Sequence, residues 1–252
     1  MITIKSDREI ELLRIAGNIV YETHQYLKKY IKPGITTLEL DKLADKFIRS
    51  KNAIPSFKGY DGFPGSICTS VNQEVVHGIP SNYKLKDGDI ISIDIGACYK
   101  GYHGDSAWSY EVGKVSAEKR KLLEDTEKAL FKGLEQVKPG NRIGDISFAI
   151  ESYAKECNLG VVKELVGHGV GTSIHEDPDV PNYGEKNTGP KLKKGMVLAI
   201  EPMLNLGSPD IVILDDDWTI ETRDYSPSAH FEHTVVVTSD GYEILTGAMQ
   251  NG

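Results

Sequence analysis

Residues 85–106 read LKDGDIISIDIGACYKGYHGDS and set two aspartates, Asp94 and Asp105, into an otherwise apolar pair of strands. A turn centred on Tyr99 and Lys100 would make these aspartates direct neighbours across a hairpin. Side chains at such positions lie about 5 Å apart, and like charges there are destabilising. The stretch therefore predicts a hairpin that holds a cation between the two carboxylates.

The composition is that of a soluble globular protein: 252 residues, 39% hydrophobic and 26% charged, with a formal net charge of −8. The negative balance argues against partners such as nucleic acid or an anionic membrane. No apolar run approaches the roughly 20 residues of a membrane span, and the first residues lack the apolar core of a signal peptide. The cysteines Cys68, Cys98 and Cys157 are widely spaced and are expected to be reduced, which predicts a cytoplasmic protein.

Three helix starts are marked by capping residues. Ser6 with Glu9 and Thr36 with Glu39 form capping boxes, and Ser116 precedes a third helix. Each is followed by apolar residues at helical spacing. Between the second helix and the acidic hairpin, residues 55–80 form a long loop rich in glycine, proline and aromatic residues. From the residues alone, its aromatic side chains are either a small cluster beneath the loop or the wall of a ligand pocket.

Two motifs recur later in the chain. YIKPGITTLEL at 30–40 is answered by QVKPGNRIGDI at 136–146, and KLKDGDIISIDIG at 84–96 by KLKKGMVLAIEPM at 191–203. The two intervals are nearly equal, which favours an internal duplication over coincidence, although each motif alone is common. We predict a single domain over residues 1–252, built from halves at about 6–115 and 116–248.

The duplication supplies two more carboxylates. Under this alignment Asp94 matches Glu201, and YHGDS at 102–106 resembles AHFEHT at 229–234, so that Asp105 matches Glu232. If the halves pack face to face about a pseudo-twofold axis, the four carboxylates meet at one place. The sequence therefore predicts an acidic site that is shared by the two halves.

The histidines are the other candidates for chemistry. His168 lies between glycines in GHG, which allow close approach of a ligand. The pattern matches no phosphate-binding loop, His175 lacks the second histidine of a zincin, and no serine or cysteine hydrolase motif is present. His24 lies in mid-helix and is expected at the surface.

Four carboxylates with one imidazole suit two hard or borderline divalent ions such as Mn or Fe(II) better than a thiolate zinc site. Two such ions about 3.5 to 4 Å apart share bridging carboxylates and a bridging water, activate that water near neutral pH, and polarise a carbonyl group. The predicted chemistry is hydrolysis.

Five motifs, VVHGIP, IDIGACYKGYHGDS, GHGVGTSIHEDP, AIEPM and FEHTVVVT, resemble those of type I methionine aminopeptidases in order and spacing. The resemblance covers essentially the whole chain and implies the α+β pita-bread fold, with two pseudo-symmetric helix-helix-sheet halves, a mostly antiparallel curved sheet and helices on its outer face. The short spacing between His175 and Ile200 indicates type I, because type II members carry an insertion there.

The resemblance also assigns site residues. It implies metal ligands Asp94, Asp105, His168, Glu201 and Glu232, with Asp105 and Glu232 bridging two divalent ions. It implies that His77 and His175 contact the substrate amide and stabilise the tetrahedral intermediate, and that Glu201 accepts a proton from the attacking water.

A methionine pocket is implied as well, formed by Tyr60, Phe63, Cys68 and Trp218. The chain departs from better-known members at Phe57, where a smaller residue is expected, and at Ile174, where an aromatic one is expected. The shape of the pocket is therefore left open, but its location is not.

The expected function is removal of the initiator methionine from nascent proteins and peptides whose second residue is small, with a water or hydroxide that bridges two ions (Mn, Fe(II), Co or Zn) as nucleophile. The alternatives are an Xaa-Pro peptidase of the same fold and a non-catalytic pita-bread binding module. The expected partner is the N-terminus of a nascent polypeptide, a monomer is the default expectation, and contact with the ribosome is left open.

Overall fold

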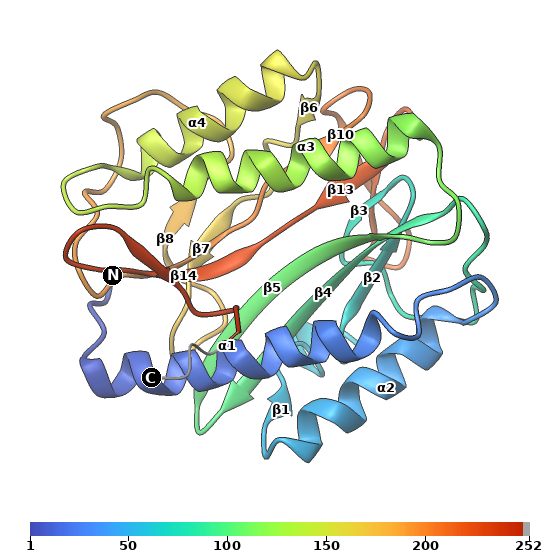
Figure 1. Cartoon of the computed structure of the whole chain (residues 1–252), viewed down its shortest axis with the longest axis horizontal. Helices are drawn as coiled ribbons and strands as arrows, with labels where there is room; N and C mark the ends of the chain where they lie inside the picture. The colour runs from blue at the N-terminus through green and yellow to red at the C-terminus, as the bar shows by residue number, and fades with distance from the viewer. Residues whose placement is uncertain (249–252) are drawn as a thin grey trace.

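A computed structural model describes residues 1–248, in which four α-helices pack on one face of a set of antiparallel sheets (Figure 1). The helices are α1 (Asp7–Leu27), α2 (Thr37–Ser50), α3 (Ala117–Leu134) and α4 (Ile143–Glu156), and a short 3-10 helix, η1, spans Tyr60–Gly62. The predicted capping boxes at Ser6 and Thr36 are present, and the side chain of Ser116 caps α3. Local capping chemistry therefore determines where three of the helices begin.

The strands are short except for the central hairpin. They are β1 (Ile54–Pro55), β2 (Cys68–Val71), β3 (Glu74–Val76), β4 (Ile90–Tyr99), β5 (Tyr102–Glu111), β6 (Gly160–Val161), β7 (Gly167–Gly169), β8 (Glu176–Val180), β9 (Val197–Ile200), β10 (Met203–Asn205), β11 (Ile211–Ile213), β12 (Ile220–Thr222), β13 (Ser228–His230), β14 (His233–Val237) and β15 (Tyr242–Ile244).

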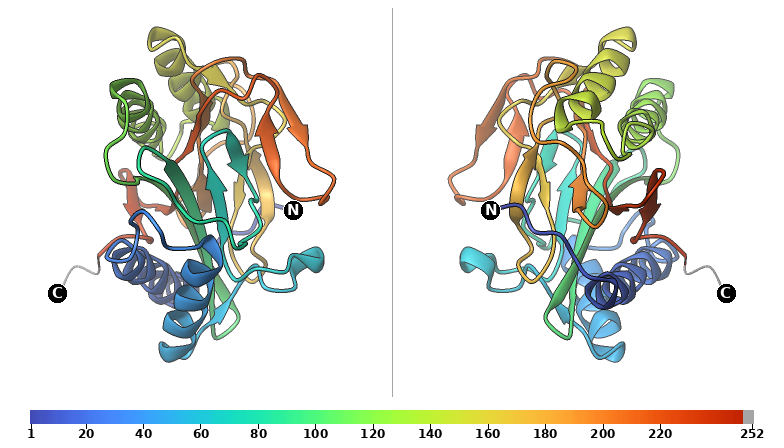
Figure 2. Two further views of the ribbon diagram at one scale, coloured as in Figure 1. Left: turned by 90° about the vertical axis from the view of Figure 1, so that its right-hand side faces the viewer. Right: turned by 90° about the vertical axis from the view of Figure 1, so that its left-hand side faces the viewer.

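The strands form four sheets in which each described pair is antiparallel. The first half contributes β1-β4-β2 with β5 on β4, and the second contributes β15-β14-β9-β7-β8. Figure 2 shows the helices on one side of the strands and the β11–β12 hairpin on the other. The expected α+β class, with antiparallel strands and helices on the outer face, is confirmed.

The predicted turn of the central hairpin is wrong by one residue, which shifts the cross-strand partners by two residues. The turn lies at Lys100 and Gly101, so that Asp94 pairs with Ala107 and Asp105 with Gly96. Lys100 has φ 49° and Gly101 φ 84°, and a two-residue hairpin turn of this kind needs positive φ at both positions. Glycine meets that need, so the turn forms one residue later than expected. The two aspartates are diagonal neighbours on one face of the hairpin.

The prediction that His24 lies on the surface is also wrong, because its side chain is fully buried. It follows Val20 by four residues and so continues the buried stripe of α1 that packs on β5. Its Nδ1 lies 3.0 Å from the Tyr110 hydroxyl and its Nε2 2.9 Å from the Ser106 carbonyl oxygen. Burial lowers the pKa of His24 to about 3, so the ring is neutral.

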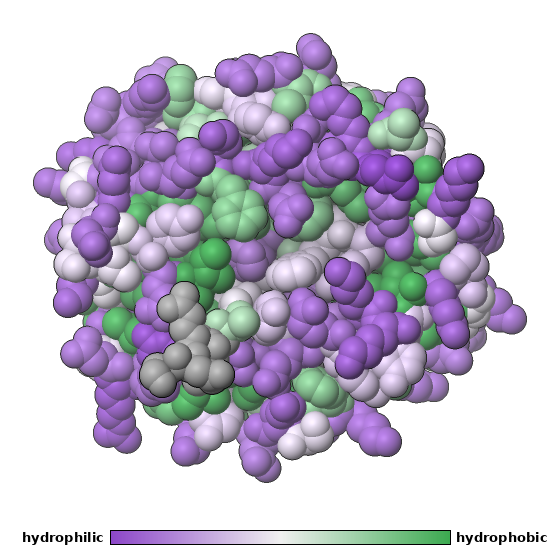
Figure 3. All heavy atoms as spheres, in the orientation of Figure 1, coloured by the Kyte–Doolittle hydropathy of each residue, from purple (hydrophilic) through white to green (hydrophobic). Residues whose placement is uncertain are grey.

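Each helix pair covers its own apolar core. One core lies beneath α1 and α2 and includes Ile91 and Ile93 of β4, and the other lies beneath α3 and α4 and includes Leu198 of β9. The outward faces of α1 and α3 are mainly hydrophilic in Figure 3. Within residues 1–248, the helices are too short or too polar to cross a membrane.

The turns that follow α1 and α3 make matching contacts. The Gly34 amide donates to the Leu85 carbonyl at 2.8 Å, and the Gly140 amide donates to the Leu192 carbonyl at 3.3 Å. Both glycines have φ 98°. Isolated bridges join Thr36 to Lys84 and Arg142 to Lys191 in the same way. The repeated sequence motifs thus occupy equivalent positions in the two halves.

The halves join along β5 and β14. The Thr234 hydroxyl donates to the Asp105 carbonyl oxygen at 2.7 Å and accepts from the Asp105 amide at 3.2 Å. The Ser106 hydroxyl donates to the Glu232 carbonyl oxygen at 2.5 Å, and the Glu232 amide donates to the Ala107 carbonyl at 2.8 Å. This seam places the acidic residues of one half against those of the other.

Candidate functional site

A cavity of about 520 Å³ opens beside the seam between the halves. Its lining includes each of the site residues named from the sequence: Tyr60, Phe63, Cys68, His77, Asp94, Asp105, His168, His175, Glu201, Trp218 and Glu232. These residues come from positions 60 to 232 and from both halves. The fold thus brings the predicted acidic, imidazole and apolar groups to one place, although it does not by itself assign their roles.

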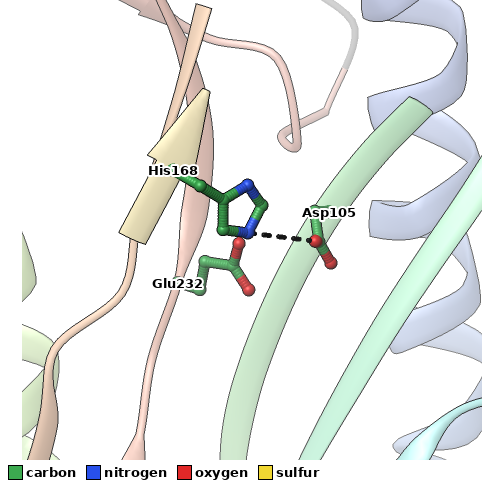
Figure 4. A group of neighbouring side chains, drawn as sticks. All are labelled: Asp105, His168 and Glu232. Carbon is green, nitrogen blue, oxygen red and sulfur yellow. Dashed lines mark ion pairs between the residues drawn. The ribbon is translucent and has the colours of Figure 1, made fainter. Parts of the chain in front are cut away.

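The four carboxylates reach the cavity from different strands. Asp94 lies on β4 and Asp105 on β5, Glu201 directly follows β9, and Glu232 lies between β13 and β14. Asp105 and Glu232 are almost fully buried. In Figure 4 the side chains of Asp105, Glu232 and His168 point toward one another. One ligand atom from each of these three lies within 4.8 Å of the others, as the ligands of a metal ion do.

His168 presents a nitrogen lone pair to the carboxylates. Its Nδ1 lies 3.0 Å from the carbonyl oxygen of Gly169, to which it donates when protonated there. The opposite nitrogen, Nε2, is 3.7 Å from Asp105 Oδ2 and 3.4 Å from Glu201 Oε1. Burial lowers the pKa of His168 to about 3. A backbone acceptor on one nitrogen and a free lone pair on the other is the usual arrangement of a metal-binding histidine.

The acidic cluster carries negative charge that no side chain of the cavity balances, since its described lining contains no lysine or arginine. Burial raises the pKa of Asp94 to about 7 and that of Glu201 to about 8. It also raises the pKa values of Asp105 and Glu232 well above normal, with a further increase from neighbouring carboxylates. Without a cation, these groups would be partly protonated at neutral pH.

Several polar atoms of this cluster have no hydrogen-bond partner. Asp94 Oδ1, Asp105 Oδ1 and Glu232 Oε1 are buried and unpaired. Buried acceptors are normally satisfied, so oxygens left without partners around one point mark a place for an ion. Hard carboxylate oxygens with imidazole nitrogen fit a divalent cation. The residues present therefore fit a metal site.

Two further histidines face the cavity. His175 follows the turn after β7, its Nδ1 lies 2.9 Å from the Tyr60 hydroxyl, and its ring packs edge-on to His168 at 4.2 Å. His77 follows β3 and has φ 58°, a backbone conformation that is uncommon for a residue with a side chain. Burial lowers the pKa values of both rings, that of His77 to about 4. Both are neutral imidazoles that can donate a hydrogen bond.

An apolar slot adjoins the acidic cluster. Phe63 and Trp218 meet edge to face at 5.1 Å, and both pack with Cys68 in a separate small core. Phe57 and Ile174 belong to the same core. The two positions that depart from the family pattern therefore lie in or directly behind the slot. The loop aromatics are both a local cluster and a cavity wall, so the two interpretations left open from the sequence are compatible.

The sequence did not single out His230, which also lines the cavity. His230 is almost fully buried, and its Nε2 lies 3.3 Å from Glu201 Oε2 without a hydrogen bond. Burial lowers its pKa to about 4. His230 precedes Glu232 by two residues, and side chains two apart in an extended strand share a face. That spacing in AHFEHT was the signal that would have identified it.

Known proteins are similar to this chain in sequence and in fold. The sequence signature of Metallopeptidase family M24 matches residues 11–239. Methionine aminopeptidase 1 of Bacillus subtilis is 58% identical over 246 residues, which cover 98% of this chain and 99% of that protein. The crystal structure of methionine aminopeptidase from Rickettsia prowazekii superposes with a TM-score of 0.96 at 45% identity, covering 98% of this chain and 100% of that chain. The similarity thus extends over nearly the full length of each protein.

A prolidase provides the contrast. The prolidase from Pyrococcus furiosus superposes with a TM-score of 0.78 at 25% identity, and the match covers 98% of this chain but only 66% of that chain. Sequence identity and structural agreement are both lower than for the aminopeptidases. The pita-bread fold expected from the sequence motifs is confirmed by these matches.

Proposed function

The chain belongs to metallopeptidase family M24, and from that premise we propose that it hydrolyses the N-terminal methionine from proteins and peptides whose second residue is small. The observation that carries the proposal is the buried carboxylate cluster with unpaired oxygens at the end of an apolar slot. A slot closed at one end by a charged site suits an enzyme that acts on the first residue of a chain. The full-length identity to methionine aminopeptidases supports the same substrate.

We propose that two divalent ions occupy the cluster, held by Asp94, Asp105, His168, Glu201 and Glu232. The family resemblance implies that Asp105 and Glu232 would bridge the two ions, and both carboxylates are deeply buried beside His168. When bound, such ions polarise a carbonyl group and lower the pKa of water. Mn, Fe(II), Co and Zn are all compatible with carboxylate and imidazole ligands.

Side chains of this protein would then donate hydrogen bonds to the substrate and transfer protons. His77 and His175 are neutral and can each donate an N–H to the scissile amide or to the negative charge that develops on its oxygen. The Tyr60 hydroxyl beside His175 Nδ1 fixes the orientation of that ring. We propose that Glu201 accepts a proton from the attacking water and returns it to the leaving amine.

The methionine side chain would lie in the slot formed by Phe63, Cys68 and Trp218, with Tyr60 at its mouth. A thioether makes favourable contacts with aromatic edges and with a buried thiol. Phe57 narrows the wall of this slot, and Ile174 packs behind it. We infer that a tight space beyond the scissile bond limits the size of the second residue.

The remaining inferences concern the whole molecule. We propose that residues 1–252 form one domain that arose by duplication, with halves at about 6–115 and 116–248. The matching contacts of Gly34 and Gly140 support this proposal. Residues 249–252 lie outside the described residues.

Nascent polypeptides are the proposed substrates in the cytoplasm, and the free cysteines agree with a reducing compartment. We propose a monomer that needs no partner subunit to complete its cavity.

Release of free methionine tests the proposal. Purified protein, loaded with Mn or Co under anaerobic conditions, is assayed on Met-Ala-Ser, Met-Leu-Ser and Ala-Pro-Ser. We expect rapid release from Met-Ala-Ser, at least about 100-fold slower release from Met-Leu-Ser and no cleavage before proline, since bulk beyond the slot costs transition-state binding. Preferential cleavage of Ala-Pro-Ser would instead support the Xaa-Pro peptidase, and a metal-loaded protein that cleaves none of the peptides would contradict the proposal.

A further inference from the structure

A buried ion pair lies beneath the turn that carries His175. Lys5 Nζ is 2.5 Å from Glu176 Oε2, and the two side chains are only 6% and 14% exposed. The Thr3 hydroxyl donates to the same carboxylate oxygen at 3.0 Å and also contacts the Lys5 ammonium. Figure 2 shows the N-terminal segment passing beside the strands of the second half, far in sequence from residue 176. A pair so well enclosed is costly to bury unless its geometry is good.

The pair is attached to the turn on one side and to the sheet on the other. Glu176 Oε1 accepts a hydrogen bond from the Ser173 amide at 3.2 Å, and the Gly171 amide donates to the Ser173 carbonyl at 3.1 Å. The Lys5 amide donates to the Gly195 carbonyl at 2.8 Å, just before β9. The carboxylate therefore links the turn at 171–176 to a lysine that is itself anchored next to the strand leading to Glu201.

Gly171 leaves room for this pair. A Cβ at this position would lie 2.3 Å from Glu176 Oε1 and 2.5 Å from Lys5 Nζ. Gly171 does not have a positive φ, so its backbone conformation does not itself call for glycine. The missing side chain instead provides the space that the ion pair fills. The turn, the glycine and the pair thus form one closely fitted unit next to His175.

We propose that Lys5 is a positioning residue, whose ion pair with Glu176 fixes the turn that presents His175 to the substrate. The inference rests on the proposed function, in which His175 donates a hydrogen bond to the scissile amide. Buried pairs contribute little net stability, because desolvation offsets their attraction. The relevant property of such a pair is that it fixes geometry. A substitution far from the reacting atoms that displaces a catalytic group by about 1 Å can reduce turnover by about 100-fold.

Two substitutions disturb the pair in different ways. Lys5→Met removes the charge and keeps the length of the side chain. Gly171→Ala keeps both charges, but its Cβ would force the Glu176 carboxylate and the Lys5 ammonium apart. The matched control is Arg14→Met, which breaks the Arg14–Glu243 pair, 2.7 Å long and partly exposed, between α1 and β15 and away from the cavity. Methionine release from Met-Ala-Ser is measured well below the melting temperature of each variant.

We expect both Lys5→Met and Gly171→Ala to reduce kcat by about 10- to 100-fold with KM within about threefold of wild type, because a transition-state contact is displaced. Arg14→Met is expected to stay within about twofold. Lys5→Arg keeps the charge and is expected to recover most of the activity. Folded Lys5→Met and Gly171→Ala proteins with kcat within twofold of wild type would overturn the proposal.

Hydrogen exchange at the Ser173 amide provides a readout that needs no turnover. We expect exchange to become at least about tenfold faster in Gly171→Ala and in Lys5→Met, while the amides of α1 are unchanged. Unchanged exchange at Ser173 in Gly171→Ala would overturn the proposal that the ion pair fixes the turn. This test remains decisive even if Lys5→Met does not fold. An inactive wild type would contradict only the proposed function, because the exchange result still decides whether the pair holds the turn.

Discussion

Thr234→Val removes the hydroxyl that joins the two halves at Asp105. In the native structure this hydroxyl satisfies both the amide and the carbonyl of Asp105, at 3.2 and 2.7 Å, and Thr234 is fully buried. Valine has nearly the same shape, so the substitution leaves no cavity but leaves two buried backbone groups unpaired. Each such group costs about 1 to 3 kcal/mol. For the two groups together, we therefore expect the free energy of unfolding to fall by about 2 to 6 kcal/mol.

The assay is equilibrium unfolding in urea, followed by far-ultraviolet circular dichroism and by tryptophan fluorescence. Coincident transitions by the two probes justify a two-state free energy. With a slope of about 3 kcal/mol per molar, the urea midpoint is expected to fall by about 0.7 to 2 M. The control is Thr238→Val in the partly exposed turn after β14, where water replaces the lost hydrogen bonds and the change should stay within about 0.5 kcal/mol. A loss below 0.5 kcal/mol for Thr234→Val would refute the reasoning.

Two further predictions concern the cavity. The metal-free protein should lose stability as the pH rises from about 7 to 9, because Glu201 keeps a raised pKa of about 8 when folded but a pKa near 4 when unfolded, so that the folded state binds more protons. The buried histidines are largely neutral in both states over this range. In thermal melts with EDTA, the melting temperature of Glu201→Gln should fall less steeply with rising pH than that of wild type. A melting temperature that rises with pH would contradict this prediction. His230→Leu should reduce turnover by about tenfold or more, because it removes the nitrogen 3.3 Å from Glu201 Oε2. Turnover equal to that of wild type in a peptide-release assay would show that His230 is only a wall residue.

The local features of the fold were predictable because they depend on neighbours in sequence. Capping boxes and apolar spacing predicted the helix starts, which depend on hydrogen bonds within one turn. The repeated motifs predicted that Glu201 and Glu232 would lie at one place with Asp94 and Asp105, and the four carboxylates line one cavity. The apolar slot required the family resemblance, since nothing in the loop at 55–80 distinguishes a cavity wall from a small core.

The errors arose where tertiary structure decides. The hairpin register depended on which two residues take positive φ, and Gly101 is better suited than Tyr99. The burial of His24 depended on β5 lying across α1, which offers Tyr110 and the Ser106 carbonyl as partners. His230 is hard to identify from the sequence, because Glu232 alone accounts for the acidic motif AHFEHT. The sequence signal for His24 is its spacing of four residues from Val20 in the helix. The signal for His230 is its spacing of two residues from Glu232 in an extended segment.

The most direct test of the central claim is the metal content of wild-type protein and of Asp105→Asn after anaerobic purification, measured together with methionine release from Met-Ala-Ser. We expect about two divalent ions per wild-type chain, together with release of methionine. In Asp105→Asn we expect loss of at least one ion and of activity, because that carboxylate faces His168 and Glu232 across the seam. An Asp105→Asn protein that keeps both ions and near-normal turnover would contradict the proposed metal site.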